Sequence, residues 1–259
     1  MERLVAARNI GFMSLLVFGL SVQAAEVKVL SAIGMQSVME DLAPKFERAT
    51  GHKLAMAFTT AGAAVKRAQG GEAADVVIAT RQGIDGLVKN GKATADNVTA
   101  LASAGISVAI RKGAPKPDIS SPAALKRTLL AAKSISYVDP ASGGASGIHF
   151  VTVLDRLGIA NEMKAKTVFP SAKTPAEVGV LVANGEAEIG VHVVVELISV
   201  AGIDLVGPLP GDLQNTIVFS AAIMTDAKDA AAAKALIDFL RTADAAKVMK
   251  SKGMEPAAP

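Results

Sequence analysis

The strongest constraint on the fold is a repeated alternation between short apolar runs and segments with apolar residues at helical spacing. Residues 27–30, 53–58 and 75–79 are predicted strands, and each is followed by such a helical segment. The first of these helices is predicted to end near Gly51. The third run is almost entirely apolar, as parallel strands tend to be. Strands that alternate with helices in this way favour a doubly wound parallel sheet.

The second part of the chain repeats this α/β pattern. Its predicted strands cover residues 107–111, 134–138, 165–169, 188–193 and 216–224. Helices are predicted over about 123–132, 148–157 and 175–183, and one or two more over 228–250. The chain has 259 residues and is 51% hydrophobic, which is enough for one large domain or two of ordinary size.

Loops of small residues follow the predicted strands of the first part, at 31–34, 59–62 and 80–83. Ligands of open parallel sheets bind beyond the carboxyl ends of the strands, so these loops can face one cleft. A fourth such loop lies in Asp139–Ile148, between a strand and a helix, where backbone N–H groups turn towards an anion. This stretch has neither a Gly-Lys-Ser/Thr ending nor GxGxxG spacing. It is therefore either a site for an anion other than a nucleotide or a plain turn capped by Ser or Asp.

Composition argues against several classes of function. The formal net charge is +3 and the Lys and Arg residues are scattered, which argues against a nucleic-acid partner. Only 3% of the residues are aromatic, too few for a platform that stacks ligand rings. The chain has no Cys, which excludes disulfides, thiol catalysis and Cys metal ligands. His52, His149 and His192 form no local ligand motif, so neither a metal nor another cofactor is predicted.

Residues 1–25 have the pattern of a secretory signal peptide. A basic start precedes an apolar stretch at 10–22, and the small-x-small rule places cleavage after Ala24 or Ala25. The apolar stretch is short for a membrane span, although an uncleaved anchor is the alternative. No later segment has about 20 uninterrupted apolar residues. We therefore expect a soluble periplasmic protein with no stable membrane insertion once the signal is removed.

Several segments also carry a resemblance to a known family. They are Val29–Gln36, Ala57–Gly62, Gly71–Ile78, Asp139–Ile148 and Gly185–Gly190. Through them the chain resembles the periplasmic solute-binding proteins of ABC importers, in particular the molybdate- and tungstate-binding group. The Ala-Asp-Val-Val-Ile and Gly-Glu-Ala-x-x-Gly elements are quite specific, and the resemblance covers nearly all of residues 26–255.

The resemblance implies the type 2 periplasmic binding fold. Its fold class is α/β, with two doubly wound lobes joined by two crossing strands and the ligand cleft between them. The crossings are expected near 107–111 and 216–224. Residues 26–106 with 216–259 would form lobe 1, and residues 107–215 would form lobe 2. The family also implies a monomer that captures a small anion, a carboxylate or an oxyanion, for an ABC permease.

The implied ligand site lies at the strand-end loops of both lobes. Gly34 stands where the molybdate group has a Ser, and Val193 stands where that group has a Tyr. Arg81 follows the third predicted strand, and a guanidinium fork suits a carboxylate. These differences favour a carboxylate over a metal oxyanion. The predicted ligand-binding residues are Gly34, Thr59, Thr60, Ala61, Arg81, Ser142, Ser146, Gly147 and His192.

The resemblance extends to exported isomerases that act on aconitate, because the same superfamily looks to include them. A second function therefore stays open. Such an enzyme needs a base beside an acidic C–H and donors that stabilise the enolate-like charge. The candidate bases are His192, His149 and Glu196, and none of them lies in a motif that identifies it. Solute binding is the default interpretation, and cofactor-independent isomerisation of a tricarboxylate is its rival.

Overall fold

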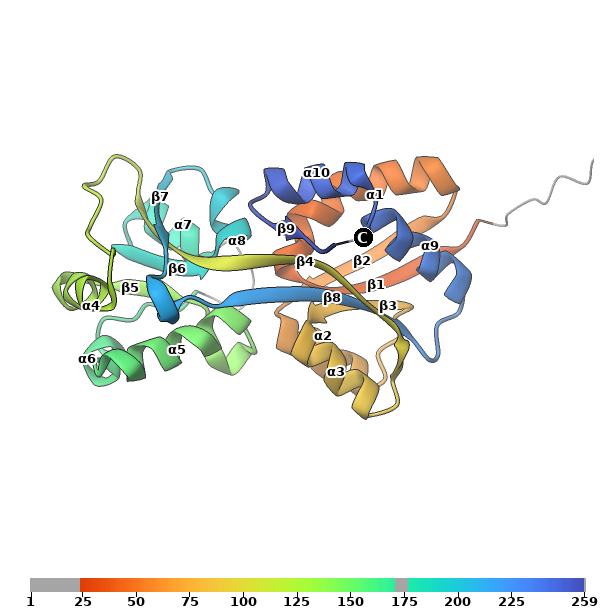
Figure 1. Ribbon diagram of the computed structural model, residues 1–259, viewed down its shortest axis with the longest axis horizontal. Helices are drawn as coiled ribbons and strands as arrows, with labels where there is room; N and C mark the ends of the chain where they lie inside the picture. The colour runs from red at the N-terminus through yellow and green to blue at the C-terminus, as the bar shows by residue number, and fades with distance from the viewer. Residues whose placement is uncertain (1–23, 171–176, 259) are drawn as a thin grey trace, which may run out of the picture.

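The computed structural model describes residues 24–170 and 177–258, which form two α/β lobes joined by two long strands (Figure 1). The long strands are β4 (Ala93–Arg111) and β8 (Thr216–Met224). The first lobe holds β1 (Glu26–Ala32), η1 (Ile33–Met35), α1 (Gln36–Thr50), β2 (Lys53–Thr59), α2 (Ala61–Gln69), β3 (Val76–Thr80), α3 (Arg81–Lys89), α9 (Ala230–Leu240), α10 (Ala243–Ser251) and β9 (Glu255–Pro256). The second holds α4 (Pro122–Ala131), β5 (Ile135–Tyr137), η2 (Pro140–Ser142), α5 (Ala145–Leu157), α6 (Ala160–Lys164), α7 (Glu177–Asn184), β6 (Ile189–Val193), α8 (Val194–Ile198), β7 (Ile203–Pro208) and η3 (Gly211–Leu213).

Strand pairing runs in the order β2-β1-β3-β8-β4-β6-β5, and β7 and β9 also pair with β4. β1 is parallel to both of its neighbours, β2 and β3. β8 is antiparallel to β3 and β4. β4 pairs with β8 over its first part and with β6 and β7 at its end, from Ile106 to Arg111. β4 therefore belongs to both lobes.

The strand ends of the first lobe lie on one edge of the sheet. Ala32 at the end of β1 is in register with Thr59 at the end of β2. Helices α2 and α3 begin directly after β2 and β3, because Thr60 and Thr80 act as their N-caps. Each Thr side chain accepts a hydrogen bond from a backbone N–H of the first turn at 3.3 Å. Short strand-to-helix turns of this kind bring helix N-termini to the same edge.

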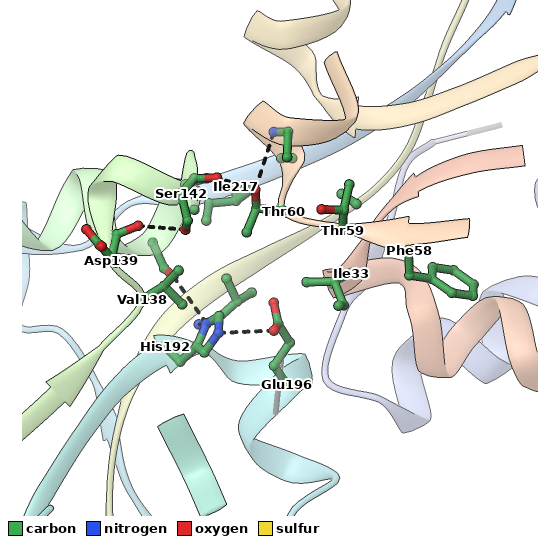
Figure 2. A pocket seen from close by; sticks show the side chains of 18 of the residues that line it. Ile33, Phe58, Thr59, Thr60, Val138, Asp139, Ser142, His192, Glu196 and Ile217 are labelled. Carbon is green, nitrogen blue, oxygen red and sulfur yellow. Dashed lines mark hydrogen bonds and ion pairs between the residues drawn. The ribbon is translucent and has the colours of Figure 1, made fainter. Parts of the chain in front are cut away.

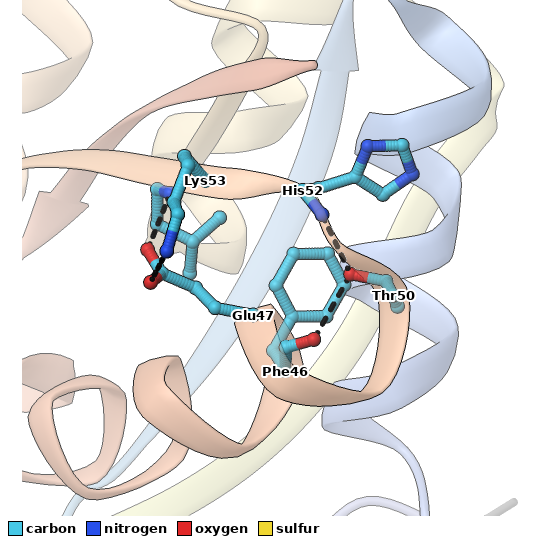
Figure 3. Close-up of polar contacts among 6 residues, drawn as sticks. Phe46, Glu47, Thr50, His52 and Lys53 are labelled. Carbon is cyan, nitrogen blue, oxygen red and sulfur yellow. Dashed lines mark hydrogen bonds and ion pairs between the residues drawn. The ribbon is translucent and has the colours of Figure 1, made fainter. Parts of the chain in front are cut away.

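The end of α1 shows how the sequence sets a boundary between elements (Figure 3). Gly51 follows the helix with a φ of 79°, in the left-handed region where a residue without a Cβ is favoured. The Thr50 hydroxyl accepts from the His52 N–H at 3.2 Å. Glu47 accepts from the Lys53 ammonium at 2.8 Å, which lowers the pKa of the Glu47 carboxyl. His52 is thus part of a helix-to-strand connection.

A buried carboxylate ties the central strand β3 to its neighbours. Asp75 is 3% exposed and precedes β3. Its side chain accepts from the Lys28 N–H at 2.7 Å and from the Lys228 N–H at 2.6 Å. Its backbone carbonyl accepts from the Met224 N–H at 3.0 Å. The Ala-Asp-Val-Val-Ile element is therefore explained by the structure of the sheet, without a role in ligand binding.

Three predictions of secondary structure need correction. Residues 165–169 do not form a strand, because only Thr167 forms a bridge, with Ile135 of β5. β4 begins at Ala93, well before the predicted start at 107. β7 was not predicted from the sequence, because Gly207 and Pro208 at its end are typical of a turn. The remaining predicted strands are present with small differences at their ends.

Some predictions fall outside what the structure tests. Residues 1–23 of the predicted signal peptide and residues 175–176 of the predicted helix at 175–183 lie outside the described residues. The lobe boundaries at 106/107 and 215/216 fall within β4 and just before β8, and they stay a prediction. Within the described ranges, every helix is too short or too polar to cross a bilayer.

Candidate ligand-binding site

A cavity of about 500 Å³ lies between the strand ends of the two lobes (Figure 2). The residues that line it come from both lobes and from β8. They are Ala32, Ile33, Gly34, Phe58, Thr59, Thr60, Ala61, Ala63, Val138, Asp139, Ser142, Gly144, Ala145, Ser146, Pro170, His192, Val193, Glu196, Ile217 and Phe219. The volume suits a small organic acid or an inorganic oxyanion.

Two helices begin at the cavity wall, α2 at Ala61 and α5 at Ala145. The first N–H groups of a helix have no partner within the helix, and its N-terminus carries a partial positive charge. The N-cap of α5 is Gly144, which has no side chain to occupy these donors. The hydroxyls of Thr60 and Ser142 lie beside the helix starts and donate to the carbonyls of Ser142 and Asp139, so they hold the loops in place. The cavity therefore offers an anion neutral hydrogen-bond donors from both lobes.

The two lobes touch across the cavity at a pair of glycines. The Gly62 N–H donates to the Gly143 carbonyl at 3.0 Å, and Thr60 Oγ1 donates to the Ser142 carbonyl. A Cβ on Gly62 would lie 2.9 Å from both the Cα and the carbonyl oxygen of Gly143. Gly143 also has a φ of 77°, which disfavours any residue with a side chain. The structure is therefore in a closed arrangement that only glycine permits at these two positions.

A buried acid–base pair, His192 and Glu196, lies on the second-lobe wall of the cavity. The His192 side chain is 4% exposed and the Glu196 side chain is 9% exposed. His192 Nε2 and Glu196 Oε2 are 3.0 Å apart, an ion-pair distance, although they are not aligned as a hydrogen bond. Neither atom has another hydrogen-bond partner among the described residues. In Figure 2 the Glu196 carboxyl points into the cavity with the imidazole beside it.

The other imidazole nitrogen is held by two groups. His192 Nδ1 accepts from the Val193 backbone N–H at 2.7 Å, and Ser146 Oγ lies 3.1 Å from the same nitrogen. His192 is the last residue but one of β6 and Ser146 belongs to the first turn of α5, so the contact joins two elements of one lobe. The imidazole is thereby fixed in orientation at the cavity wall.

The structure brings most of the predicted site residues to this cavity. Those that line it are Gly34, Thr59, Thr60, Ala61, Ser142, Ser146, His192 and Glu196. Gly147 is not among the lining residues, and its backbone packs so closely against Val138, just after β5, that a Cβ there would lie 1.9 Å from the Val138 carbonyl oxygen. His149 does not line the cavity either, and its Nε2 contacts the Leu213 carbonyl at 2.8 Å.

Arg81 does not reach the cavity. It therefore gives no reason to expect a carboxylate as the ligand. Arg81 is the first residue of α3, and its side chain is 56% exposed. Its Nε pairs with Asp85 one turn along the same helix at 2.8 Å. No Arg or Lys is among the described residues of the lining, whereas Asp139 and Glu196 are. Any anion in the cavity is therefore surrounded by neutral donors and near two acids.

Several lining residues were missed by the sequence analysis. Phe219 is the clearest case, because it lies on β8, which was considered only as a crossing strand. A Cβ on Gly34 would lie 2.6 Å from Phe219 Cζ, so the ring fills the space of a side chain at position 34. Asp139 was considered only as a possible cap, Ile33 was placed in a predicted loop of small residues, and Ile217 was placed in a predicted crossing strand. Apolar residues on strands give no signal that separates a cavity wall from a core.

The described residues offer no site for a metal. In residues 24–170 and 177–258, no three His, Cys, Asp or Glu side chains converge closely enough to hold an ion.

Comparison with known proteins identifies the class of this chain. Residues 27–255 match the family described as "Bacterial extracellular solute-binding protein", and the chain belongs to this family. Its fold is that of the type 2 periplasmic binding proteins. The sulfate-binding protein SubI from Mycobacterium tuberculosis H37Rv has a similar structure, with a TM-score of 0.75 and 17% identity over 91% of this chain and 88% of that one.

Within the family the chain is similar to the molybdate-binding group and to an enzyme. It is 31% identical to the molybdate-binding protein ModA of Azotobacter vinelandii over 258 residues, 98% of this chain and 97% of that protein. It is 37% identical to the aconitate isomerase of a Pseudomonas species over 235 residues, 88% of this chain and 87% of that protein. The resemblance drawn from the sequence motifs is thus confirmed.

Proposed function

We propose that this chain is an exported, cofactor-independent isomerase that encloses aconitate, or a closely similar polycarboxylate, between its lobes and shifts its double bond. The observation that carries the proposal is the His192–Glu196 pair, which is buried, lines the cavity and leaves a carboxyl group facing the ligand space. The similarity to aconitate isomerase over most of both chains supports the choice of substrate.

The reaction needs only a proton transfer. Aconitate is a propene that carries three carboxyl groups, and its methylene hydrogens lie next to both a carboxyl group and the double bond. A base removes one of these protons, and the electron pair spreads over the three-carbon unit and its carboxylates. Return of a proton to the carbon at the other end restores aconitate with the double bond in the other position. Whether cis- or trans-aconitate forms then depends on the rotation about the carbon–carbon bond that becomes the new double bond.

The cavity supplies what this reaction needs besides a base. Enolate-like charge is stabilised by donors that are already oriented before the reaction begins. The N–H groups in the first turn of α5, the Ala61 N–H at the start of α2 and the Thr59 hydroxyl are such donors. Closure at Gly62 and Gly143 restricts the entry of water, which strengthens these interactions.

The test is direct turnover. Purified protein without its first 25 residues is incubated with cis-aconitate in the presence of a metal chelator, and trans-aconitate is followed by chromatography. We expect turnover in the wild type and a loss of about 10²–10⁴-fold in Glu196→Gln. Glu162→Gln, on the exposed surface of α6, is the matched control and should keep wild-type activity. Absence of turnover at every pH from about 6 to 9, together with tight binding of an anion, would refute the proposal.

A second candidate is capture of a tetrahedral oxyanion for an ABC importer. The observation that favours it is a lining without Arg or Lys among the described residues, in which helix N-termini and the Thr59 hydroxyl supply the donors. The similarity to ModA over nearly the whole of both chains points the same way. Calorimetry with molybdate, sulfate and cis-aconitate separates the two functions. Tighter binding of molybdate, with no turnover of aconitate, would favour this candidate.

For either function we propose a periplasmic location, with residues 1–25 as a cleaved signal peptide. We propose a permease partner only if the chain captures an oxyanion for transport. We propose a monomer for either function. Intact-mass analysis of the exported protein tests the cleavage, and a mass that still includes Met1 would contradict it. Light scattering tests the oligomeric state.

A further inference from the structure

We propose that Glu196 is the residue that moves the proton, and that His192 is a positioning residue which does not itself exchange protons with the substrate. This inference rests on the proposed isomerase function and assigns roles within the same cavity. The sequence left His192, His149 and Glu196 as candidates, none of them in a motif that identifies it. The hydrogen bonds around the imidazole separate them.

The first step is the position of the imidazole proton. A backbone N–H can only donate, so the 2.7 Å contact from Val193 requires His192 Nδ1 to be an acceptor. Ser146 is 1% exposed, and its Oγ lies 3.1 Å from this same nitrogen, where its hydroxyl donates to it. The single proton of the neutral ring is therefore on Nε2.

The second step is what this tautomer permits. To work as a general acid, the imidazole must first carry protons on both nitrogens. A proton on Nδ1 would point at the Val193 N–H only 2.7 Å away. To work as a base, the ring needs a free lone pair, and the lone pair of Nδ1 is already occupied by Val193 and Ser146. His192 can therefore donate through Nε2 but cannot take a proton from a substrate in this arrangement.

The third step concerns Glu196. Its Oε2 is fully buried and lies 3.0 Å from His192 Nε2, which carries the proton. Its Oε1 is on the side of Gly34, 3.5 Å from where a Cβ on that glycine would lie. Gly34 and Glu196 both line the cavity, so this oxygen lies at the cavity wall. The imidazole thus contacts one carboxyl oxygen at 3.0 Å, and the other carboxyl oxygen is the one available for the reaction.

In the resulting cycle, the Glu196 carboxyl group both removes the proton and returns it, so no other proton donor or acceptor is needed. Glu196 Oε1 takes a proton from the substrate methylene, so a C–H bond breaks and an O–H bond forms. The O–H bond then breaks as the proton goes to the far carbon of the three-carbon unit, and the carboxylate is restored. His192 Nε2 stays in contact with Oε2 and, by packing against it, holds the carboxyl group beside the substrate.

The test compares a conservative replacement at each position. In Gln, the side-chain amide nitrogen occupies about the place of imidazole Nε2 and remains a donor. We expect kcat for cis-aconitate to fall by about 10²–10⁴-fold in Glu196→Gln, with a similar loss of exchange between the substrate methylene and D2O. We expect His192→Ala to lose at least about tenfold in kcat and His192→Gln to recover to within about tenfold of the wild type. His149→Gln, outside the cavity, is the matched control.

Other results would overturn the inference. The inference is wrong if His192→Gln loses as much turnover and exchange as Glu196→Gln while it still binds cis-aconitate normally. It is also wrong if Glu196→Gln keeps wild-type turnover. Nitrogen NMR of the wild-type imidazole is independent of any variant's folding, and it should find His192 Nε2 protonated and Nδ1 not. The opposite tautomer would contradict the assignment. A wild type without turnover or exchange would overturn the proposed function, and this inference with it.

Discussion

The contact between Gly62 and Gly143 allows lobe closure to be tested separately from the chemistry. In Gly62→Ala the new Cβ would lie 2.9 Å from the Cα and the carbonyl oxygen of Gly143. Ordinary carbon contacts begin near 3.4 Å, so the two loops must separate by about half an ångström. The 3.0 Å hydrogen bond between these residues is then lost or severely weakened. The substitution acts only where the lobes meet, so it penalises the closed form.

The magnitude follows from the two effects. Loss of the hydrogen bond costs about 1 kcal/mol, and the forced contact costs about 1–3 kcal/mol. The closed form should therefore be destabilised by roughly 2–4 kcal/mol, which weakens a ligand that needs closure by roughly 30- to 1000-fold. The open form bears neither cost, and Ala in place of Gly within α2 can stabilise the helix by up to about 1 kcal/mol.

The assay is the thermal shift with and without ligand. Wild-type protein with ligand at about 100 times its dissociation constant gains about 2.7 kcal/mol. At the same concentration, a variant with affinity weakened 100-fold gains only about 0.4 kcal/mol. Gly86→Ala is the matched control, because Gly86 lies in α3 and nothing is within 4 Å of its added Cβ. If Gly62→Ala keeps the wild-type shift with both cis-aconitate and molybdate, closure at this contact is not needed for binding.

Three further predictions follow from the described contacts. Asp75→Ala removes the acceptor for two backbone N–H groups and should lower the free energy of unfolding by about 3–5 kcal/mol in urea, whereas Asp226→Ala on the surface should change it by less than about 0.5 kcal/mol. Gly34→Ser should lose ligand binding because its Cβ meets Phe219, and adding Phe219→Ala should restore part of it in calorimetry; equal loss in the double variant would contradict this explanation. Ser146→Ala should lower kcat by about tenfold or less with little change in KM, because a hydrogen bond of about 1 kcal/mol that orients His192 is lost; a change in KM alone would indicate a direct ligand contact.

The fold class could be predicted from the sequence because the residues that mark the ends of helices and strands act locally. The left-handed glycine at Gly51 marks the end of α1, and the hydroxyls of Thr60 and Thr80 mark helix starts after strands. Strand ends followed by small residues then identify the edge where a ligand binds. The same reasoning brought Ser142 and Ser146 to the site, because both lie where a helical turn follows β5.

The errors have a different physical origin, because they concern the direction of single side chains. Arg81 is at a strand end, as predicted, but it begins α3, and an acidic residue one turn later draws its side chain along the helix. Gly147 was predicted to bind the ligand, but it does not line the cavity, and a Cβ at this position would clash with the Val138 carbonyl oxygen. Phe219 was not considered at all, since apolar strand residues look alike whether they face a core or a cavity.

His192 and Glu196 illustrate why a function can be harder to derive than a fold. They are four residues apart, yet β6 ends at Val193 and α8 begins at Val194, so helical periodicity does not relate them. Their approach depends on the turn between these elements, whose Val193 N–H also fixes the imidazole. An anion cradle of helix N-termini needs no acid of its own, and a carboxylate beside an anionic ligand opposes binding. A buried Glu on that wall is therefore more readily explained by proton transfer than by capture alone.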